Sequence, residues 1–261
     1  MTDLLSKLTN LSYELFGVFL PGIIASVFGV FFWIALGSAA PEWTYNILPI
    51  FNLTALNTLL NSMKLANGIS AFIPLVIFWY FLGHIILWVG RSGNPSLDAK
   101  KKSIKRIWLS LIFCIPKPNE NFNPKLQSLF DVIKKDFSTN EIDLDWRQFF
   151  PVAKIYLAQR STTSLVSNYQ NKYTLHRSIT TICAVLFWLT LLALLGSFIA
   201  IKLGTQTANC ELLFTLLLLS VIFVWGFSSS YMYHWEMFGN TIVTETYSLL
   251  HSPKDVESSQ K

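Results

Sequence analysis

The sequence predicts an all-α integral membrane protein with four transmembrane helices and a small helical cytoplasmic domain between the second and third spans. The 261 residues are 52% hydrophobic and only 13% charged, whereas soluble domains carry about 25% charged residues. Four separate stretches of 24 residues or more contain no Asp, Glu, Lys or Arg. Most of the Lys and Arg residues lie together, between the second and third of these stretches. The same figures exclude intrinsic disorder, which requires low hydrophobicity and high charge.

The four uncharged stretches are predicted to be membrane-spanning helices. A spanning helix needs about 20 apolar residues, and in lipid only helices and closed barrels satisfy the polar groups of the backbone. The stretches are continuously apolar and lack the alternation of barrel strands. The first is expected to be retained rather than cleaved as a signal peptide, because acidic residues and no clear basic region precede it. The predicted spans are 16–38, 71–90, 179–201 and 212–232.

The distribution of basic residues predicts the orientation of the spans. Segment 91–177 carries 15 of the 20 Lys and Arg residues, whereas segment 39–70 carries only Lys64. Cytoplasmic loops are enriched in Lys and Arg. We therefore expect a multi-pass protein of the cell inner (plasma) membrane, with segment 91–177 and both chain termini in the cytoplasm.

The same pattern predicts the domain organisation. Residues 1–90 are expected to form a transmembrane hairpin with an outer loop at 39–70, and residues 178–250 a second hairpin whose helices continue into the cytoplasm. The third span is predicted to begin near Thr163 and the fourth to continue through Ile242. Segment 91–177 is expected to be a basic helical domain, and 251–261 a disordered tail.

Two helices are predicted inside segment 91–177. The first follows the helical spacing of Leu126, Leu129, Phe130, Ile133 and Phe137. The second runs from Trp146 to Arg160 behind a capping Asp145, with Pro151 breaking or kinking it. Because a domain of fewer than 90 residues buries a small core, packing against a neighbouring subunit is expected to support it.

Known catalytic and cofactor motifs are missing from the sequence. It contains no phosphate-binding GxxxxGK[ST] loop and no GxGxxG, HExxH or CxxC motif, and its three cysteines are far apart. We therefore predict no enzyme activity, no cofactor and no metal. A lipid-modifying enzyme remains a minor alternative, in which His84, His234 and Glu236 gather at one membrane level.

Polar residues within the predicted spans are the candidates for a pore or gate, since polar groups in lipid are costly. His84 lies in the second span, and Ser229, Tyr231 and Glu236 lie at the cytoplasmic end of the fourth. The alternatives are a neutral His84 imidazole bonded to a neighbouring helix, and a fourth span that simply leaves the membrane at its polar end. Pro21-Gly22 in the first span is predicted to be a packing kink or a hinge that moves on gating.

Basic residues of the cytoplasmic domain are the candidates for anion contacts. They would bind either anionic lipid headgroups or an anionic nucleotide or nucleic-acid signal. These residues are Lys100, Lys101, Lys102, Lys105, Arg106, Lys134, Lys135 and Arg160.

Three short motifs carry a resemblance to a known group of proteins. They are Phe19-Leu20-Pro21-Gly22 in the first span, Gly83-His84 in the second, and Tyr173-Thr174-Leu175-His176-Arg177 leading into the third. In this layout the chain resembles uncharacterised bacterial four-span membrane proteins, some of which are effectors of anti-phage defence systems. The resemblance implies a membrane pore or membrane-disrupting oligomer held off or triggered by a cytoplasmic signal.

Two functions are therefore expected in order of preference. The first is a homo-oligomeric effector that forms or gates an ion-conducting or permeabilising pore and is controlled through segment 91–177, because a single four-span chain has little room for a conduit. The second is a non-enzymatic membrane anchor or adaptor that recruits a cytoplasmic regulator or partner protein through the same segment.

Overall fold

The computed structural model describes residues 11–37, 69–92, 122–137, 145–160, 165–204 and 208–251, and the regular structure within them is helical throughout. Four helices are long and apolar enough to cross a membrane, which confirms the four apolar helices predicted from the sequence. Their bounds are Leu11–Leu36, Ile73–Gly90, Val166–Leu203 and Cys210–His251. Most of the outer loop predicted at 39–70, the basic group Lys100–Arg106 and tail residues 252–261 lie outside the described residues.

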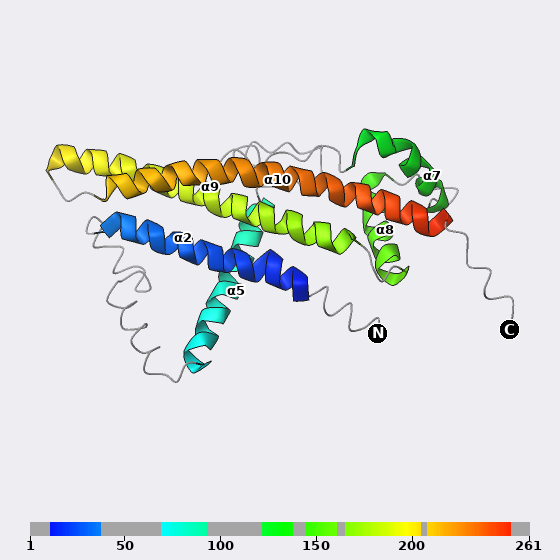
Figure 1. The fold of residues 1–261 in the computed structure, drawn as a ribbon, viewed down its shortest axis with the longest axis horizontal. Coiled ribbons are helices and arrows are strands. Elements are labelled where there is room, and N and C mark those ends of the chain that lie inside the picture. Colours follow the sequence, from blue (N-terminus) through cyan, green and yellow to red (C-terminus); the bar gives the residue numbers. More distant parts are fainter. Residues whose placement is uncertain are drawn as a thin grey trace.

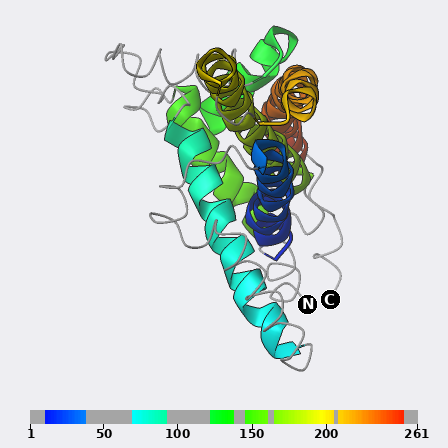
Figure 2. The same cartoon turned by 90° about the vertical axis from the view of Figure 1, so that its left-hand side faces the viewer.

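The first apolar helix is interrupted near its start. A π-helical turn, η1 (Leu15–Phe19), passes into α2 (Leu20–Leu36) just before Pro21. Proline has no backbone N–H to donate and its ring crowds the preceding turn, and in membrane helices a local π adjustment can satisfy the backbone groups that proline frees. The second apolar helix, α5 (Ile69–Ser92), crosses α2 at a steep angle (Figures 1 and 2).

The longest helices, α9 (Val166–Leu203) and α10 (Cys210–His251), form an antiparallel hairpin, with α2 beside its distal half (Figure 1). Gly204 ends α9 in the left-handed conformation, with φ of 67°, which glycine adopts without steric cost. The Asn209 backbone N–H donates to the Ala35 carbonyl at 2.9 Å and ties this turn to the end of α2. Small apolar clusters of α2, α9 and α10 close that end.

Both predicted extensions of the hairpin are confirmed at the level of helix bounds. Helix α9 begins at Val166, near the predicted Thr163, and α10 continues without interruption to His251. Gly239 does not break α10, and it is buried where the helix packs. The hairpin therefore extends well beyond the predicted spans at one end.

A small helical domain sits on that extended end. It comprises η4 (Pro124–Leu126), α7 (Gln127–Phe137) and α8 (Trp146–Arg160). Asp145 caps α8, because its carboxylate accepts from the Gln148 N–H at 2.9 Å while the Gln148 side chain accepts from the Asp145 N–H at 3.3 Å. Pro151 lies within α8, which stays one continuous helix.

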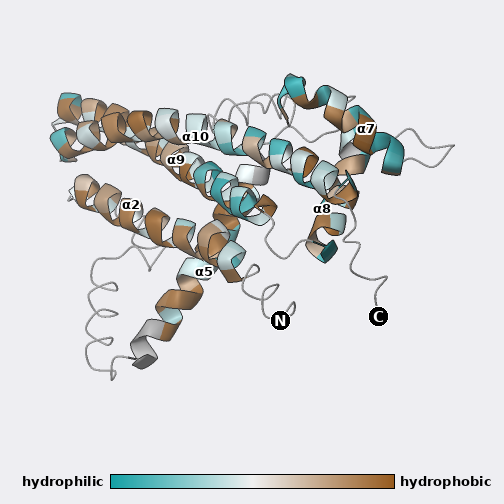
Figure 3. Ribbon diagram, turned by 45° about the vertical axis from the view of Figure 1, so that its right-hand side comes forward, coloured by the Kyte–Doolittle hydropathy of each residue, from teal (hydrophilic) through white to brown (hydrophobic). Residues whose placement is uncertain are grey.

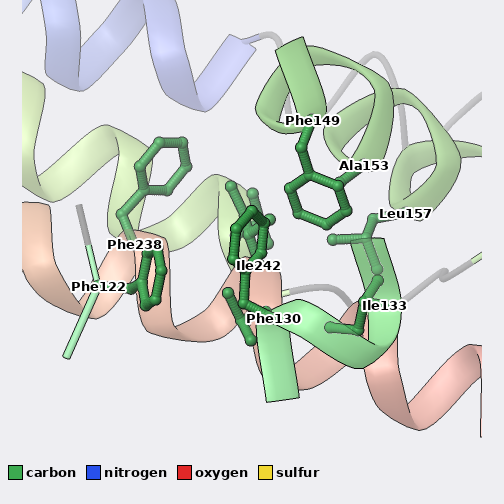
Figure 4. Close-up of a cluster of buried hydrophobic side chains, with 10 residues drawn as sticks. Phe122, Phe130, Ile133, Phe149, Ala153, Leu157, Phe238 and Ile242 are labelled. Atoms are coloured by element: carbon green, nitrogen blue, oxygen red, sulfur yellow. The ribbon is translucent and has the colours of Figure 1, made fainter. Parts of the chain in front are cut away.

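The core of this domain is shared with the long hairpin (Figure 4). Ring contacts join α7 to α8, with Phe130 and Phe149 centroids 5.1 Å apart, and α8 to α10, with Phe150 and Phe238 centroids 5.4 Å apart. Segment 91–177 does not fill this core by itself, because side chains of α10 complete it. The buried residues are Phe122, Phe130, Ile133, Phe149, Ala153, Leu157, Val166, Phe238, Ile242 and Val243.

Candidate functional site

The candidate site is the junction at which α9 and α10 leave the predicted spans and enter the helical domain. Along α9 and α10 the hydropathy changes from mainly apolar at the distal turn to mixed and polar towards α7 and α8 (Figure 3). We call residues 169–181 of α9 and 227–238 of α10 the junction. It brings together aromatic rings, two histidines and a buried arginine near the predicted ends of two spans.

An aromatic group in the junction connects the hairpin with the helical domain. The Tyr173 ring centroid lies 5.1 Å from Trp235 and 5.2 Å from Phe238, and Phe238 in turn packs on Phe150 of α8. Aromatic pairs at these separations contribute about 0.5–1.5 kcal/mol each beyond the area they bury. The long helices and the domain are therefore in direct contact through packed aromatic side chains.

A second aromatic run extends from the junction towards α2. His176 stacks on His234 with centroids 4.9 Å apart, and its other neighbour is Phe227 at 5.5 Å. Phe227 contacts Phe223, whose centroid lies 6.1 Å from that of Phe28 in α2. Packing contacts thus continue from the junction into the predicted spans.

The two histidines are half-buried, and one ring nitrogen of each lacks a hydrogen-bond partner among the described residues. Within the described part of the chain, the Nδ1 atoms of His176 and His234 have no partner. Burial lowers the pKa of His176 to about 4, with smaller contributions from His234 and Lys172. Burial, and then the charge of Lys172, also lowers the pKa of His234. Both imidazoles are therefore neutral near pH 7.

Acidification is expected to destabilise the junction through His176. The pKa of His176 is about 4 in the folded chain and 6.5 ordinarily. Between pH 4 and pH 6.5 the folded chain therefore binds fewer protons at this residue than the unfolded chain does. The stabilising effect of His176 is complete above pH 6.5 and is lost as the pH falls towards 4. His176→Phe keeps a ring against Phe227, so in detergent its thermal midpoint should fall less than that of the wild type over this range. Equal pH slopes for the two proteins would contradict this assignment.

Arg177 faces α5 at the edge of the junction. Arg177 is only 7% exposed, and its guanidinium lies 5.9 Å from the Tyr173 ring centroid. A Cβ atom built on Gly90 of α5 would lie 3.9 Å from the Arg177 Nε and 2.9 Å from the Thr181 Oγ1. The glycine therefore lets α5 run directly beside the arginine.

Pro21-Gly22, the predicted hinge, lies at the crossing of the first two apolar helices. A Cβ atom on Gly22 would lie 1.9 Å from the Trp79 carbonyl oxygen, and one on Gly83 would lie 1.9 Å from the Val18 carbonyl oxygen. The backbones of α2, η1 and α5 thus touch through two glycines, as small residues allow in membrane helix pairs. This contact agrees with a packing role for Pro21-Gly22, and movement at this point stays a prediction.

His84 has an aromatic partner on its own helix. Its ring centroid lies 4.6 Å from Tyr80, whose hydroxyl donates to the Glu14 carboxylate at 3.0 Å. The His84 side chain is exposed in the single chain. The lipid-enzyme alternative, in which His84, His234 and Glu236 gather at one membrane level, stays a prediction; His234 stacks on His176.

The structure does not bring the other predicted pore residues to one surface. Ser229 is exposed, Glu236 is half-buried, and Tyr231 is 1% exposed because it packs between α10 and α9. Among the basic candidates described, Lys135 and Arg160 are exposed and Lys134 is half-buried. Arg160 also lies over the Tyr156 ring at 5.0 Å.

The sequence did not predict that His176 pairs with His234, and it did not indicate Arg177 as a candidate for anion contact. His176 and Arg177 both belong to the Tyr173–Arg177 motif. A group of basic and aromatic residues next to an apolar stretch could therefore have indicated them. Their partners His234 and Gly90 lie far away along the chain, and only the helix pairing reveals them.

No protein-family model, curated protein or solved structure matches the chain. The fold alone defines its class, an all-helical chain with four helices long and apolar enough to span a membrane. A helical domain shares the core at one end of its long hairpin.

Proposed function

We propose that the chain is a homo-oligomeric membrane effector that forms or gates an ion-conducting or permeabilising pore. In this proposal the four apolar helices cross the inner membrane, the helical domain and both termini lie in the cytoplasm, and the domain controls the spans. The resemblance noted in the sequence suggests a role in bacterial anti-phage defence.

One observation supports control through the domain above all others. Helices α9 and α10 run unbroken from the predicted spans into the aromatic core of the domain. A ligand or partner that displaces α7 and α8 would act on Phe238, Ile242 and Val243, which belong to the same rigid helix as the fourth span. Packed side chains and continuous helices of this kind can carry energetic coupling between two distant sites.

An oligomer follows from the size of the chain. Large apolar side chains on α2, α5, α9 and α10 are exposed in the single chain, and lipid or further copies would cover them. Four helices leave little room for a conduit, so a pore requires several copies around an axis.

Ion conduction is tested by expression and by reconstitution. Induced expression of the full chain should depolarise bacterial cells, as read with a membrane-potential dye. The purified chain should release potassium from vesicles of phosphatidylethanolamine and phosphatidylglycerol. Gly22→Ala, which separates α2 from α5, should abolish both signals, whereas Gly29→Ala should retain them because nothing lies within 4 Å of its Cβ position. Unchanged polarisation together with tight vesicles would contradict the proposal.

An anchor or adaptor is the second candidate. The observation that favours it is the exposure of Val132 on α7 and of Val152 and Ile155 on α8, at 43%, 44% and 58%, because these residues lie beyond the predicted spans. An adaptor would co-purify with a soluble partner, and polar substitutions at Val152 and Ile155 would release that partner without changing ion flux.

A further inference from the structure

We propose that Arg177 binds the phosphate group of a membrane lipid where α9 meets the end of α5. The proposal rests on the membrane placement of α5 and α9, which is part of the proposed function, and not on conduction or on an oligomer.

The first argument is that Arg177 is buried and has no anionic partner among the described residues. Among the residues that the structure describes, no carboxylate lies within ion-pair distance of it, and its Nε has no hydrogen-bond acceptor. Removing a guanidinium from water is costly unless charge and hydrogen bonds compensate it. The Tyr173 ring at 5.9 Å supplies only a weak cation–π contact.

A second pair of the same kind shows why this burial is informative. Arg160 lies over Tyr156 on α8 with the same four-residue spacing, at 5.0 Å. Arg160 is exposed, so water satisfies its five N–H donors. Arg177 has the same aromatic neighbour, but it is only 7% exposed and its Nε is buried without an acceptor in the described part of the chain. A ligand from outside the described residues would supply that acceptor.

The second argument is the level at which Arg177 lies. The predicted second span ends at Gly90 and the third begins at Ile179. The Arg177 side chain lies beside Gly90, 3.9 Å from the position of a Cβ atom there. Phosphate groups of lipids occupy this boundary between the apolar core and water. A planar guanidinium binds a phosphate through two parallel hydrogen bonds, which an ammonium group does not reproduce.

Gly90 is consistent with such a ligand. A Cβ at position 90 would lie 2.9 Å from the Thr181 hydroxyl, so a larger residue there would require the Thr181 side chain or α5 itself to shift. The glycine keeps the end of α5 close to Arg177, so a lipid bound there would contact both helices.

The test measures stabilisation of the full chain in a neutral detergent by added lipid. Phosphatidylglycerol should raise the thermal midpoint of the wild type, whereas diacylglycerol, which has the same acyl chains but no phosphate, should not. Arg177→Gln should weaken the apparent affinity for phosphatidylglycerol by ~10-fold or more, since hydrogen bonds to charged groups contribute about 1.5–3 kcal/mol. Arg177→Lys should recover part of the affinity, because it keeps the charge without the planar geometry.

Lys202→Gln is the matched control, because it removes an exposed charge from the other end of the same helix and should leave the affinity unchanged. Inorganic phosphate distinguishes the source: equal stabilisation by phosphate alone would overturn a lipid ligand. Equal responses of the wild type and Arg177→Gln, or equal stabilisation by diacylglycerol, would overturn the site. Bound phospholipid counted by native mass spectrometry gives a second readout if Arg177→Gln is unstable. Arg177→Lys should then retain less lipid than the wild type, and full retention would contradict the site. Since neither measurement involves ion flux, failure here is distinguishable from failure of the pore proposal.

Discussion

Replacing Gly22 or Gly83 by alanine is expected to destabilise the crossing of α2 and α5 strongly. Each added methyl group would lie 1.9 Å from a backbone carbonyl oxygen of the other helix. No side-chain rotation relieves a clash with backbone, so the helices must move apart and lose their contact. Overpacking commonly costs about 1–3 kcal/mol and occasionally more, and backbone clashes belong at the upper end. Thermal midpoints of the full chain in detergent measure the effect.

Gly29→Ala and Gly226→Ala provide matched controls, because nothing lies within 4 Å of a Cβ atom at either position. Alanine is also the better helix former by about 1 kcal/mol, so these variants should be as stable as the wild type or more so. If the thermal midpoints of Gly22→Ala and Gly83→Ala matched those of the controls, the close backbone contact between α2 and α5 would be contradicted.

Truncation of Phe149 is expected to unfold the helical domain while leaving the hairpin intact. Its side chain is fully buried and contacts Phe130 and Phe137 of α7. Phenylalanine-to-alanine changes in such cores cost about 3–5 kcal/mol, and the small domain has little stability to spare. Limited proteolysis should cut Phe149→Ala within residues 122–160 faster than it cuts the wild type.

Ile155→Ala is the control for this experiment, since Ile155 lies on the same helix but is 58% exposed. Surface substitutions of this kind usually change stability by less than about 0.5 kcal/mol. If Phe149→Ala and the wild type were cut at equal rates, α8 would not depend on the shared aromatic core.

Much of the helical framework was predictable because hydropathy and capping are local properties. An uncharged run of 24 residues identifies an apolar helix by counting alone. The Asp145 cap and the α7 spacing needed only neighbouring residues, and both agree with the structure. The extension of α9 was predictable because no Pro or Gly interrupts residues 161–195, whereas α10 continues although it contains Gly239.

The site was less predictable, because its residues meet across elements distant in sequence. Ser229 and Tyr231 both read as polar groups of one helix end, yet Tyr231 is buried against α9 and Ser229 is exposed. A two-residue difference turns a side chain by about 200° around a helix, and only the position of α9 decides which side is covered.

By itself the sequence determined four apolar helices, their approximate bounds and the basic character of the segment between the second and third. Only the tertiary structure decided that Gly22 and Gly83 meet, that His176 stacks on His234, and that Arg177 is buried without a carboxylate among the described residues. The physical reason is that hydropathy depends on each segment's own composition, whereas contacts and desolvation depend on which faces of separate helices come together.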